Sequence, residues 1–355
     1  MRILQLNFEP SWRGGERQVL FCMRAFRQAG HEVELLCRAG SALQGRVTAE
    51  GFTAHGRRSP PGMLAFLAAR GGHYDIMHAQ TANTVTWAVL TRALHRRPVV
   101  FTRRTPFPVR PGSEWKTAMK WRRVDALAAV SQAAAAEPRR LGLHPVVIHS
   151  AVEPHTVDPA RAAELAREYG LQGRKVLGTA AAMTREKDPV TLVRAVAELA
   201  RTRNDFVFLH FGAGGDREAE ARAEVAAQGL EGIYHFAGFR ERVEDYYSLL
   251  DVFVLTSRAE ALSGSVLDAF LQRVPVVSTD ADGQKEVLAD GRGVLCAVGD
   301  APALARGMAR CLDDADFRAE AVRRAYDYAV SEHGVMEMGR RYLDLYQRTL
   351  DARHG

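Results

Sequence analysis

The sequence predicts an α/β protein in which two doubly wound parallel-sheet domains face each other across a cleft. Short apolar runs alternate with helical patterns along all 355 residues, and this alternation is typical of parallel sheets covered by helices on both faces. The same rhythm occurs in two halves of comparable length, and a chain of this size suits two cores better than one. We therefore expect a first domain over 1–153, a second over 154–335 and a final helix over 336–355.

Six short apolar or β-branched runs in the first half predict buried strands. These runs are 2–8, 33–37, 75–79, 98–102, 126–131 and 145–150. Apolar residues with helical spacing separate them. The helices expected from that spacing are 17–29, 63–69, 85–94, 113–123 and 132–141.

The second half repeats the alternation of strands with helical or loop sequence. Its expected strands are 175–181, 206–212, 233–238, 252–257, 275–280 and 293–298. Two helices are expected after Asp300, and the last of them, 336–350, carries Met336, Tyr342 and Tyr346 on or near one face.

Composition excludes several classes of protein. Hydrophobic residues make up 47% and charged residues 25% of the chain, as in ordinary globular proteins. No apolar run is long enough for a transmembrane helix, and the opening MRILQLNF is a strand rather than a secretory signal. The four cysteines are scattered without metal spacing, which favours reduced, buried thiols and a cytoplasmic location.

Charge is unevenly distributed between the two halves. Residues 1–150 hold 22 Lys and Arg against 9 Asp and Glu, whereas the remainder holds 26 against 33. The basic half suggests an anionic partner, and without any nucleic-acid-binding module we favour a lipid or phosphoglycan over nucleic acid. An arginine-rich surface without a partner is the alternative. In the expected helix 113–123, Trp115 and Met119 lie among basic residues; packing on the chain's own sheet is favoured over contact with a membrane interface.

The segment SRAEALSGSVLDAF, from Ser257 to Phe270, is the most informative part of the chain. It links an apolar strand to a helix through a turn of small residues, and such turns bind ligands in open α/β sheets. Two carboxylates, Glu260 and Asp268, flank the turn, and carboxylates accept several hydrogen bonds from hydroxyl-rich ligands. The turn itself consists of Leu262, Ser263, Gly264 and Ser265.

This segment, with the PVVS strand at 275–278, resembles the donor-site signature of retaining family 4 glycosyltransferases of the GT-B architecture. The family usually has a second glutamate where this chain has Asp268, and a Gly-Phe-Gly-like turn where it has Leu-Ser-Gly. The resemblance implies two Rossmann-like domains, a nucleotide-diphosphate sugar as co-substrate, retention of configuration, and no metal or other cofactor. It also implies that the last helix crosses back to the first domain. Glu260 would hold the donor sugar and Asp268 the ribose hydroxyls.

The resemblance extends to residues that would meet the donor diphosphate. Gly14 and Gly15 resemble the family's Gly-Gly loop, and Lys187 matches its phosphate-gripping lysine. The family's arginine position holds Ala182, so Arg185 is the substitute that we expect. Arg104 stands near a position where the family often has histidine; because arginine stays protonated, we expect it to hold phosphate rather than to act as a base.

Three further residues are expected at the donor. Phe239 and Arg240 would flank the nucleobase, largely through backbone contacts, and Gly212 ends the expected strand 206–212. The run FGAGGDR that contains Gly212 is not a Gly-x-Gly-x-x-Gly fingerprint, because Arg217 occupies the third glycine position. This disfavours a dehydrogenase.

The sequence therefore predicts a cytoplasmic glycosyltransferase, located at the inner face of the membrane, that acts on an anionic glycan or glycolipid of the cell-envelope polysaccharide or lipopolysaccharide type. Two alternatives stay open. One is a GT-B-like sugar-nucleotide epimerase or hydrolase, which would turn over the donor without an acceptor. The other is a non-catalytic pair of Rossmann-like domains that senses a nucleotide.

Overall fold

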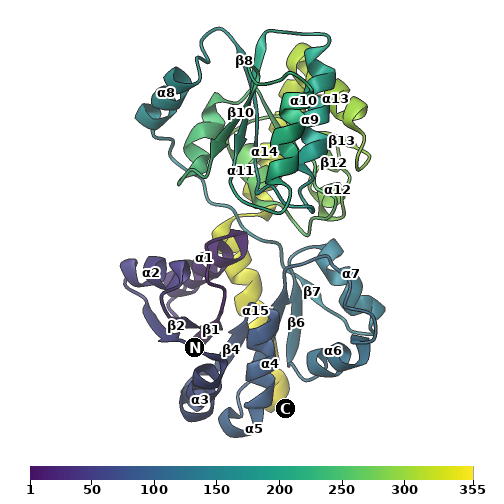
Figure 1. The fold of residues 1–355 in the computed structure, drawn as a ribbon. Helices are drawn as coiled ribbons and strands as arrows, with labels where there is room; N and C mark the ends of the chain where they lie inside the picture. The colour runs from purple at the N-terminus through teal and green to yellow at the C-terminus, as the bar shows by residue number, and fades with distance from the viewer. Residues whose placement is uncertain (355) are drawn as a thin grey trace. The chain divides into compact units, whose positions relative to one another are not determined.

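The computed structural model describes residues 1–354. The chain forms two compact units: residues 1–151 together with the chain from His333 onward make the first, and Val152–Glu332 make the second. Each unit consists of a parallel sheet with helices on its faces (Figure 1). The fold class expected from the sequence, two doubly wound α/β domains, is confirmed.

The first unit has a seven-stranded sheet of order β3-β2-β1-β4-β5-β6-β7, in which every pair is parallel. The strands are β1 (Arg2–Leu6), β2 (Glu32–Arg38), β3 (Thr53–Arg57), β4 (Ile76–Ala79), β5 (Val99–Arg103), β6 (Ala126–Ala129) and β7 (Val146–Val147). The strand order reverses between β1 and β4, and ligands of such sheets bind beyond the carboxyl ends of the strands at the reversal.

Helices cover both faces of the first sheet (Figure 1). They are α1 (Gly14–Gln28), α2 (Ala42–Ala49), α3 (Pro60–Arg70), α4 (Ala82–Leu90), α5 (Arg92–His95), α6 (Glu114–Trp121), α7 (Gln132–Arg140) and the last helix, α15 (Val335–His354). α15 packs on α1, and its Tyr342 and Tyr346 are buried in the core of this unit. Gly339 permits the close approach, since a Cβ there would lie 2.4 Å from the Ala25 Cβ.

The second unit has a six-stranded parallel sheet of order β10-β9-β8-β11-β12-β13, which reverses between β8 and β11. The strands are β8 (Lys175–Ala180), β9 (Phe206–Phe211), β10 (Tyr234–Gly238), β11 (Val252–Leu255), β12 (Val276–Thr279) and β13 (Val294–Cys296). The helices are α8 (Pro159–Glu168), α9 (Pro189–Ala200), α10 (Glu218–Ala227), α11 (Gly264–Leu271), α12 (Gly283–Val287), α13 (Ala301–Asp313) and α14 (Ala315–Glu332). β9 is buried along its whole length, as expected for an inner strand covered on both faces.

Three local expectations were wrong. The edge strand β3 was missed because its sequence, TAHGR, is polar and only half-buried. Gly14 and Gly15 do not precede α1 but form its first turn, because the N-cap lies at Arg13. Three helices rather than two follow Asp300, since the extended residue Asp314 separates α13 from α14.

Candidate functional site

The reversal point of the second sheet brings two predicted segments together. β8 and β11 are adjacent parallel strands, so the loops that leave their carboxyl ends lie next to each other. The loop after β8 carries Arg185 and Lys187, and the loop after β11 carries Glu260.

Glu260 and Lys187 are in direct contact. The Lys187 ammonium donates a hydrogen bond to Glu260 Oε2 and forms an ion pair with it. The same oxygen accepts a hydrogen bond of 3.2 Å from the Ser257 hydroxyl. Both charged side chains are partly withdrawn from solvent, with exposed fractions of 27% for Lys187 and 13% for Glu260. A cation and a carboxylate at one loop junction suit a ligand that combines phosphates with hydroxyl groups.

The backbone around Lys187 is held from several sides. The Thr256 hydroxyl lies 3.0 Å from the carbonyl oxygens of both Lys187 and Asp188. Asp188 has a positive φ of 48° and caps α9 by accepting from the Thr191 amide and hydroxyl. Its carboxylate also pairs with Arg258 at 2.8 Å. These contacts hold the loop in its shape. The cap at Asp188 could have been predicted, because Asp-Pro at a helix start is a capping signal; the contacts with Thr256 and Arg258 could not.

The turn that carries Glu260 rests on the start of α12. The Gly283 amide donates to the Glu260 carbonyl at 2.8 Å. A Cβ at Gly283 would lie 1.8 Å from the Ala261 carbonyl oxygen and 3.0 Å from that of Glu260. Glycine is thus required where α12 meets the turn, and Gly283 supports the site although it was not among the predicted site residues.

The small-residue turn leads into α11 as expected. Ser263 is its N-cap, but the Ser263 hydroxyl bonds to the Ser265 hydroxyl at 2.9 Å rather than to a backbone amide. Gly264 begins the helix, and Leu262 before it packs against the core. The first amides of any helix lack intrahelical partners and attract negative charge. Asp268, the fifth residue of α11, is buried.

Gly212 and Arg185 belong to a second contact, between the loop after β8 and the loop after β9. Gly212 has a φ of 130°, and a Cβ there would lie 2.1 Å from the Ala181 carbonyl oxygen. The Arg185 amide donates to Asp216 Oδ1 at 3.0 Å. Gly212 thus allows the two loops to touch. Beside them lies a cavity of about 250 Å³ whose lining includes the side chains of Arg185, Asp188, Thr191, Arg194, Arg217 and Arg258.

The two residues expected at the nucleobase lie on the loop after β10. Phe239 is largely exposed. The Arg240 guanidinium donates to the Ala237 carbonyl and pairs with Glu168 of α8 at 2.9 Å. Arg240 is therefore held by its own unit, which agrees with an expected role through the backbone rather than the side chain.

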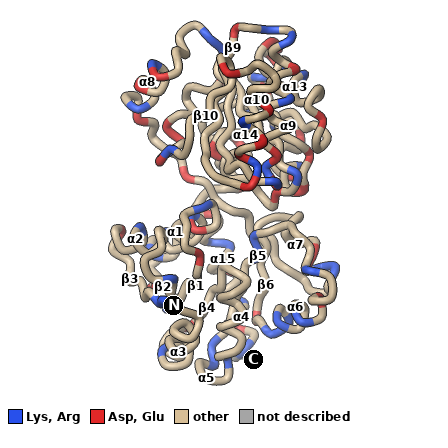
Figure 2. The backbone as a smooth tube through the Cα atoms, viewed as in Figure 1, with Lys and Arg blue, Asp and Glu red and all other residues tan. Residues whose placement is uncertain are grey.

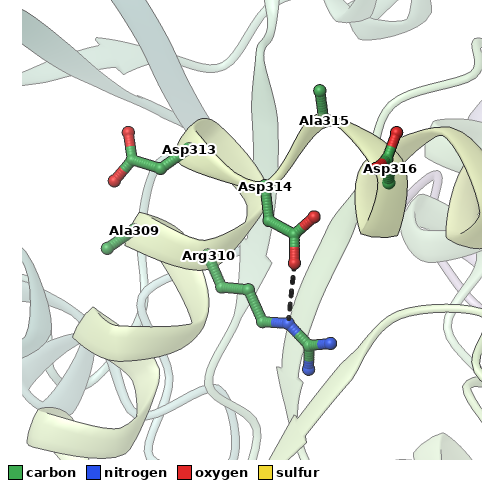
Figure 3. A pocket seen from close by; sticks show the side chains of 6 residues that line it. All are labelled: Ala309, Arg310, Asp313, Asp314, Ala315 and Asp316. Atoms are coloured by element: carbon green, nitrogen blue, oxygen red, sulfur yellow. Dashed lines mark ion pairs between the residues drawn. The ribbon is translucent and has the colours of Figure 1, made fainter.

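Another hollow in this unit, of about 560 Å³, lies where α13 meets α14 (Figure 3). Arg310 and Asp314 form an ion pair of 3.8 Å there. None of the predicted site residues lines it. Within residues 1–354, no three histidine, cysteine or acidic side chains gather as a metal-binding group.

In the first unit the predicted residues Gly15 and Arg104 are neighbours. A Cβ on Gly15 would lie 3.8 Å from the Arg104 Cδ. Arg104 directly follows the carboxyl end of β5. Its guanidinium donates two hydrogen bonds to Gln80 Oε1, one from Nε at 3.1 Å and one from Nη2 at 2.6 Å. Gln80 follows β4 at the reversal point of this sheet. Gly14, at the start of α1, has open space around it.

A buried polar network extends from Arg104 to the last helix. Gln80 Nε2 donates to Gln5 at 2.8 Å and lies 3.1 Å from His78 Nδ1. The Tyr346 hydroxyl of α15 lies 2.6 Å from the same His78 nitrogen. Burial, and then the charge of Arg104, holds the pKa of His78 well below its usual range. The imidazole is therefore neutral, and Arg104 is supported by residues that were not among the predicted site residues.

The chain matches two family models, one in each half. Residues 12–156 match the model for Glycosyltransferase Family 4, and residues 174–314 match the model for Glycosyl transferases group 1. The two matches lie side by side and together span most of the chain. The chain belongs to glycosyltransferase family 4.

Curated relatives of this family 4 glycosyltransferase act on different acceptors. A 2-deoxystreptamine glucosyltransferase of Streptomyces kanamyceticus is 32% identical over 58% of this chain and 54% of its own. A lipopolysaccharide core biosynthesis mannosyltransferase, LpcC, of Rhizobium leguminosarum is 28% identical over 67% of this chain and 68% of its own. This chain matches about half the length of the 2-deoxystreptamine glucosyltransferase and of an alpha-D-kanosaminyltransferase from the same Streptomyces species.

Solved structures confirm the GT-B fold. Anabaena HepE, solved with UDP and with UDP-glucose, has a TM-score of 0.87 at 19% identity, covering 98% of this chain and 100% of its own. A glycosyltransferase of Rickettsia africae has a TM-score of 0.85 at 17% identity, covering 98% and 99%. At these identities the likeness concerns the fold alone.

Proposed function

We propose that the chain transfers a sugar from a nucleotide-diphosphate sugar to an anionic glycan or glycolipid, with retention of configuration and without a metal ion. The observation that carries this proposal is the contact between Lys187 and Glu260 at the reversal point of the second sheet. This contact supports the proposal because an ammonium group can bind phosphate and a carboxylate can accept hydrogen bonds from sugar hydroxyls, in a chain of the glycosyltransferase family.

The proposed chemistry needs stabilisation of the leaving group above all. When the bond between the anomeric carbon and the donor phosphate breaks, negative charge develops on the diphosphate. A preorganised cation and helix-start amides stabilise such charge, and Lys187 and the first turn of α11 supply them. These groups would replace a metal ion, so transfer is expected to continue in EDTA.

Retention would follow from attack on the face that the diphosphate leaves. The acceptor oxygen bonds to the anomeric carbon as the phosphate oxygen departs, and the acceptor's proton passes to that phosphate oxygen. In this scheme Glu260 orients the sugar and forms no covalent bond. Its pairing with Lys187 supports that role, because a carboxylate engaged by an ammonium is a weaker nucleophile.

The basic first half supports an anionic acceptor. Residues 1–150 hold 22 Lys and Arg against 9 acidic residues, a balance that favours phosphorylated or acidic glycans over a cationic aminocyclitol. Relatives in lipopolysaccharide core synthesis agree with this choice. We place the reaction in the cytoplasm, at the inner face of the membrane.

A thermal-shift experiment with UDP, GDP, ADP and CMP in EDTA tests the donor part of the proposal. UDP is the first candidate because the Anabaena neighbour was solved with it. A nucleotide at about 100 times its dissociation constant should stabilise the protein by roughly 2.7 kcal/mol. Asp268→Ala should reduce that shift, and the exposed substitution Asp316→Ala should preserve it.

Product analysis separates transfer from the alternatives. Transfer requires an acceptor, whereas an epimerase or hydrolase consumes the donor alone. If a nucleotide binds but the nucleotide sugar is not consumed, with or without an added glycan or glycolipid acceptor, the chain is a nucleotide sensor. If no nucleotide stabilises it in EDTA, the metal-free donor site is wrong.

A further inference from the structure

Large apolar side chains are exposed on one part of the first unit. Leu90, at the end of α4, is 67% exposed, and Leu94 of α5 is 66% exposed. Trp115 and Met119 of α6 are 62% and 42% exposed. We call these four residues the α5–α6 surface.

The elements that carry this surface contact one another. The Lys120 ammonium of α6 donates to the Thr86 hydroxyl of α4 at 3.2 Å. Thr86 and Leu90 lie four residues apart on one side of α4, and Met119 is adjacent to Lys120. From α5, Arg92 pairs with Asp125 at 2.6 Å and donates to the Arg123 carbonyl, so it joins α5 to the end of α6.

Packing inside the unit does not explain these exposed side chains. The buried face of α6 is formed by Ala118 and Trp121, and Trp121 contributes to the core together with Phe101. Trp115 and Met119 of the same helix are exposed instead. The expectation that they pack on the chain's own sheet was therefore wrong.

The surroundings of the surface are strongly basic. Residues 90–123 contain ten Lys and Arg but a single acidic residue, Glu114. Six of these basic residues are exposed: Arg96, Arg97, Arg110, Lys116, Arg122 and Arg123. Figure 2 shows this basic character along α5 and α6. Apolar side chains, one of them tryptophan, are thus interleaved with positive charge.

We propose that the α5–α6 surface docks on an anionic lipid bilayer. Tryptophan and leucine side chains bury their apolar parts at the boundary of headgroups and acyl chains, while lysine and arginine bind the headgroup phosphates. A soluble polyanion would attract the basic residues but would leave the four apolar side chains in water. Within residues 1–354, no helix has the length and apolar content of a membrane span.

Docking here leaves the predicted ligand residues of the first unit accessible. α5 leads into the amino end of β5, and α6 ends shortly before the amino end of β6, whereas Arg104 follows the carboxyl end of β5. Gly15 lies beside Arg104. The surface is therefore separate from these residues, and lipid binding can be measured whether or not the proposed transfer takes place.

Vesicle co-sedimentation of the full chain tests this proposal. Vesicles of phosphatidylcholine and phosphatidylglycerol in equal amounts should bind the protein, and vesicles of phosphatidylcholine alone should bind it weakly. The double variant L94S/W115S keeps every charge and should bind the anionic vesicles at least tenfold more weakly. Val330→Ser, at an exposed valine of α14, is the matched control and should bind like the parent.

Charge variants and a soluble polyanion complete the test. Lys116→Gln should weaken binding to anionic vesicles about fivefold, the effect of one basic residue near such a surface, and added salt should weaken binding further. Soluble polyphosphate should compete less effectively than anionic vesicles. Equal binding of L94S/W115S and the parent, with a normal melting temperature, would overturn the proposal; charge-dependent binding to polyphosphate alone would assign the surface to a soluble polyanion instead.

Discussion

Lys187 and Glu260 form an ion pair although 73 positions of sequence separate them. The pair exists because β8 and β11 are neighbours in the sheet, and the loops after neighbouring parallel strands lie at the same edge. Each residue is partly buried, so the loss of one leaves the other without its partner in a poorly solvated place. The proposed donor would bring a phosphate to the lysine and hydroxyl groups to the carboxylate.

Removal of Lys187 should impair transfer far more than folding. Lys187→Ala deletes the cation that would face the developing charge of the diphosphate. We therefore expect kcat/KM for the sugar donor to fall by about 10²–10³, the effect of removing one preorganised group that stabilises charge in the transition state. Lys175→Ala is the matched control, because Lys175 also pairs with a carboxylate, that of Asp251, but at the amino end of β8. Equal losses in the two variants would remove Lys187 from the reaction.

Much of the fold could be predicted from the sequence because buried parallel strands have a clear signal. The expected strand 206–212, for example, is β9, Phe206–Phe211, in the structure, and the doubling of the pattern indicated two sheets. The edge strand β3 has little burial and therefore little apolar pattern. Exposure of Trp115 was also unpredictable, because helical spacing places Trp115 and Met119 on one face without saying which face turns inward.

The site was predicted only in part for a different reason. Glu260 and Lys187 each belong to a motif that lies within one short stretch of sequence, so each residue could be recognised from its own stretch. Their contact, and the support from Gly283 and Gln80, depends on which strands become neighbours. Neither Gln80 nor Tyr346 has a local pattern that links it to Arg104. Tertiary structure alone makes these connections.

The Gln80 side chain should position Arg104. Gln80→Ala removes the acceptor of two guanidinium hydrogen bonds, and a hydrogen bond to a charged group contributes about 1.5–3 kcal/mol. The variant should raise the KM of the ligand that Arg104 binds by about tenfold, with a smaller change in kcat. Gln80→Glu, which restores an acceptor, should recover most of the loss. A parent-like KM in Gln80→Ala would show that Arg104 needs no such support.

Stability should fall on acidification because histidines are buried in their neutral form. Burial lowers the pKa of His210 to about 4; its ring lies 2.7 Å from the Tyr234 hydroxyl and 3.1 Å from the Ala181 carbonyl. In the unfolded chain a histidine binds a proton at about pH 6.5. The stability that neutral His210 contributes is therefore fully present above that pH. Between about pH 6.5 and 4 the free energy of unfolding falls by at most about 1.4 kcal/mol per pH unit. His78 acts in the same direction.

Urea denaturation at several pH values measures this dependence. His210→Gln should flatten the stability profile between about pH 6.5 and 4, although it lowers stability at neutral pH through the lost hydrogen bonds. His144→Gln, at an exposed position in the first unit, should leave the profile unchanged. An identical slope in the parent and in His210→Gln would mean that other groups cause the acid sensitivity.

Gly283 should be required for the shape of the Glu260 turn. In Gly283→Ala the new methyl carbon would lie 1.8 Å from the Ala261 carbonyl oxygen, so α12 must move away from the turn and lengthen the bond between the Gly283 amide and the Glu260 carbonyl. Overpacking of this kind costs about 1–3 kcal/mol. The melting temperature and kcat/KM should both fall. Gly232→Ala, where a Cβ meets nothing within 4 Å, should change neither, and a parent-like Gly283→Ala enzyme would show that the turn tolerates the displacement.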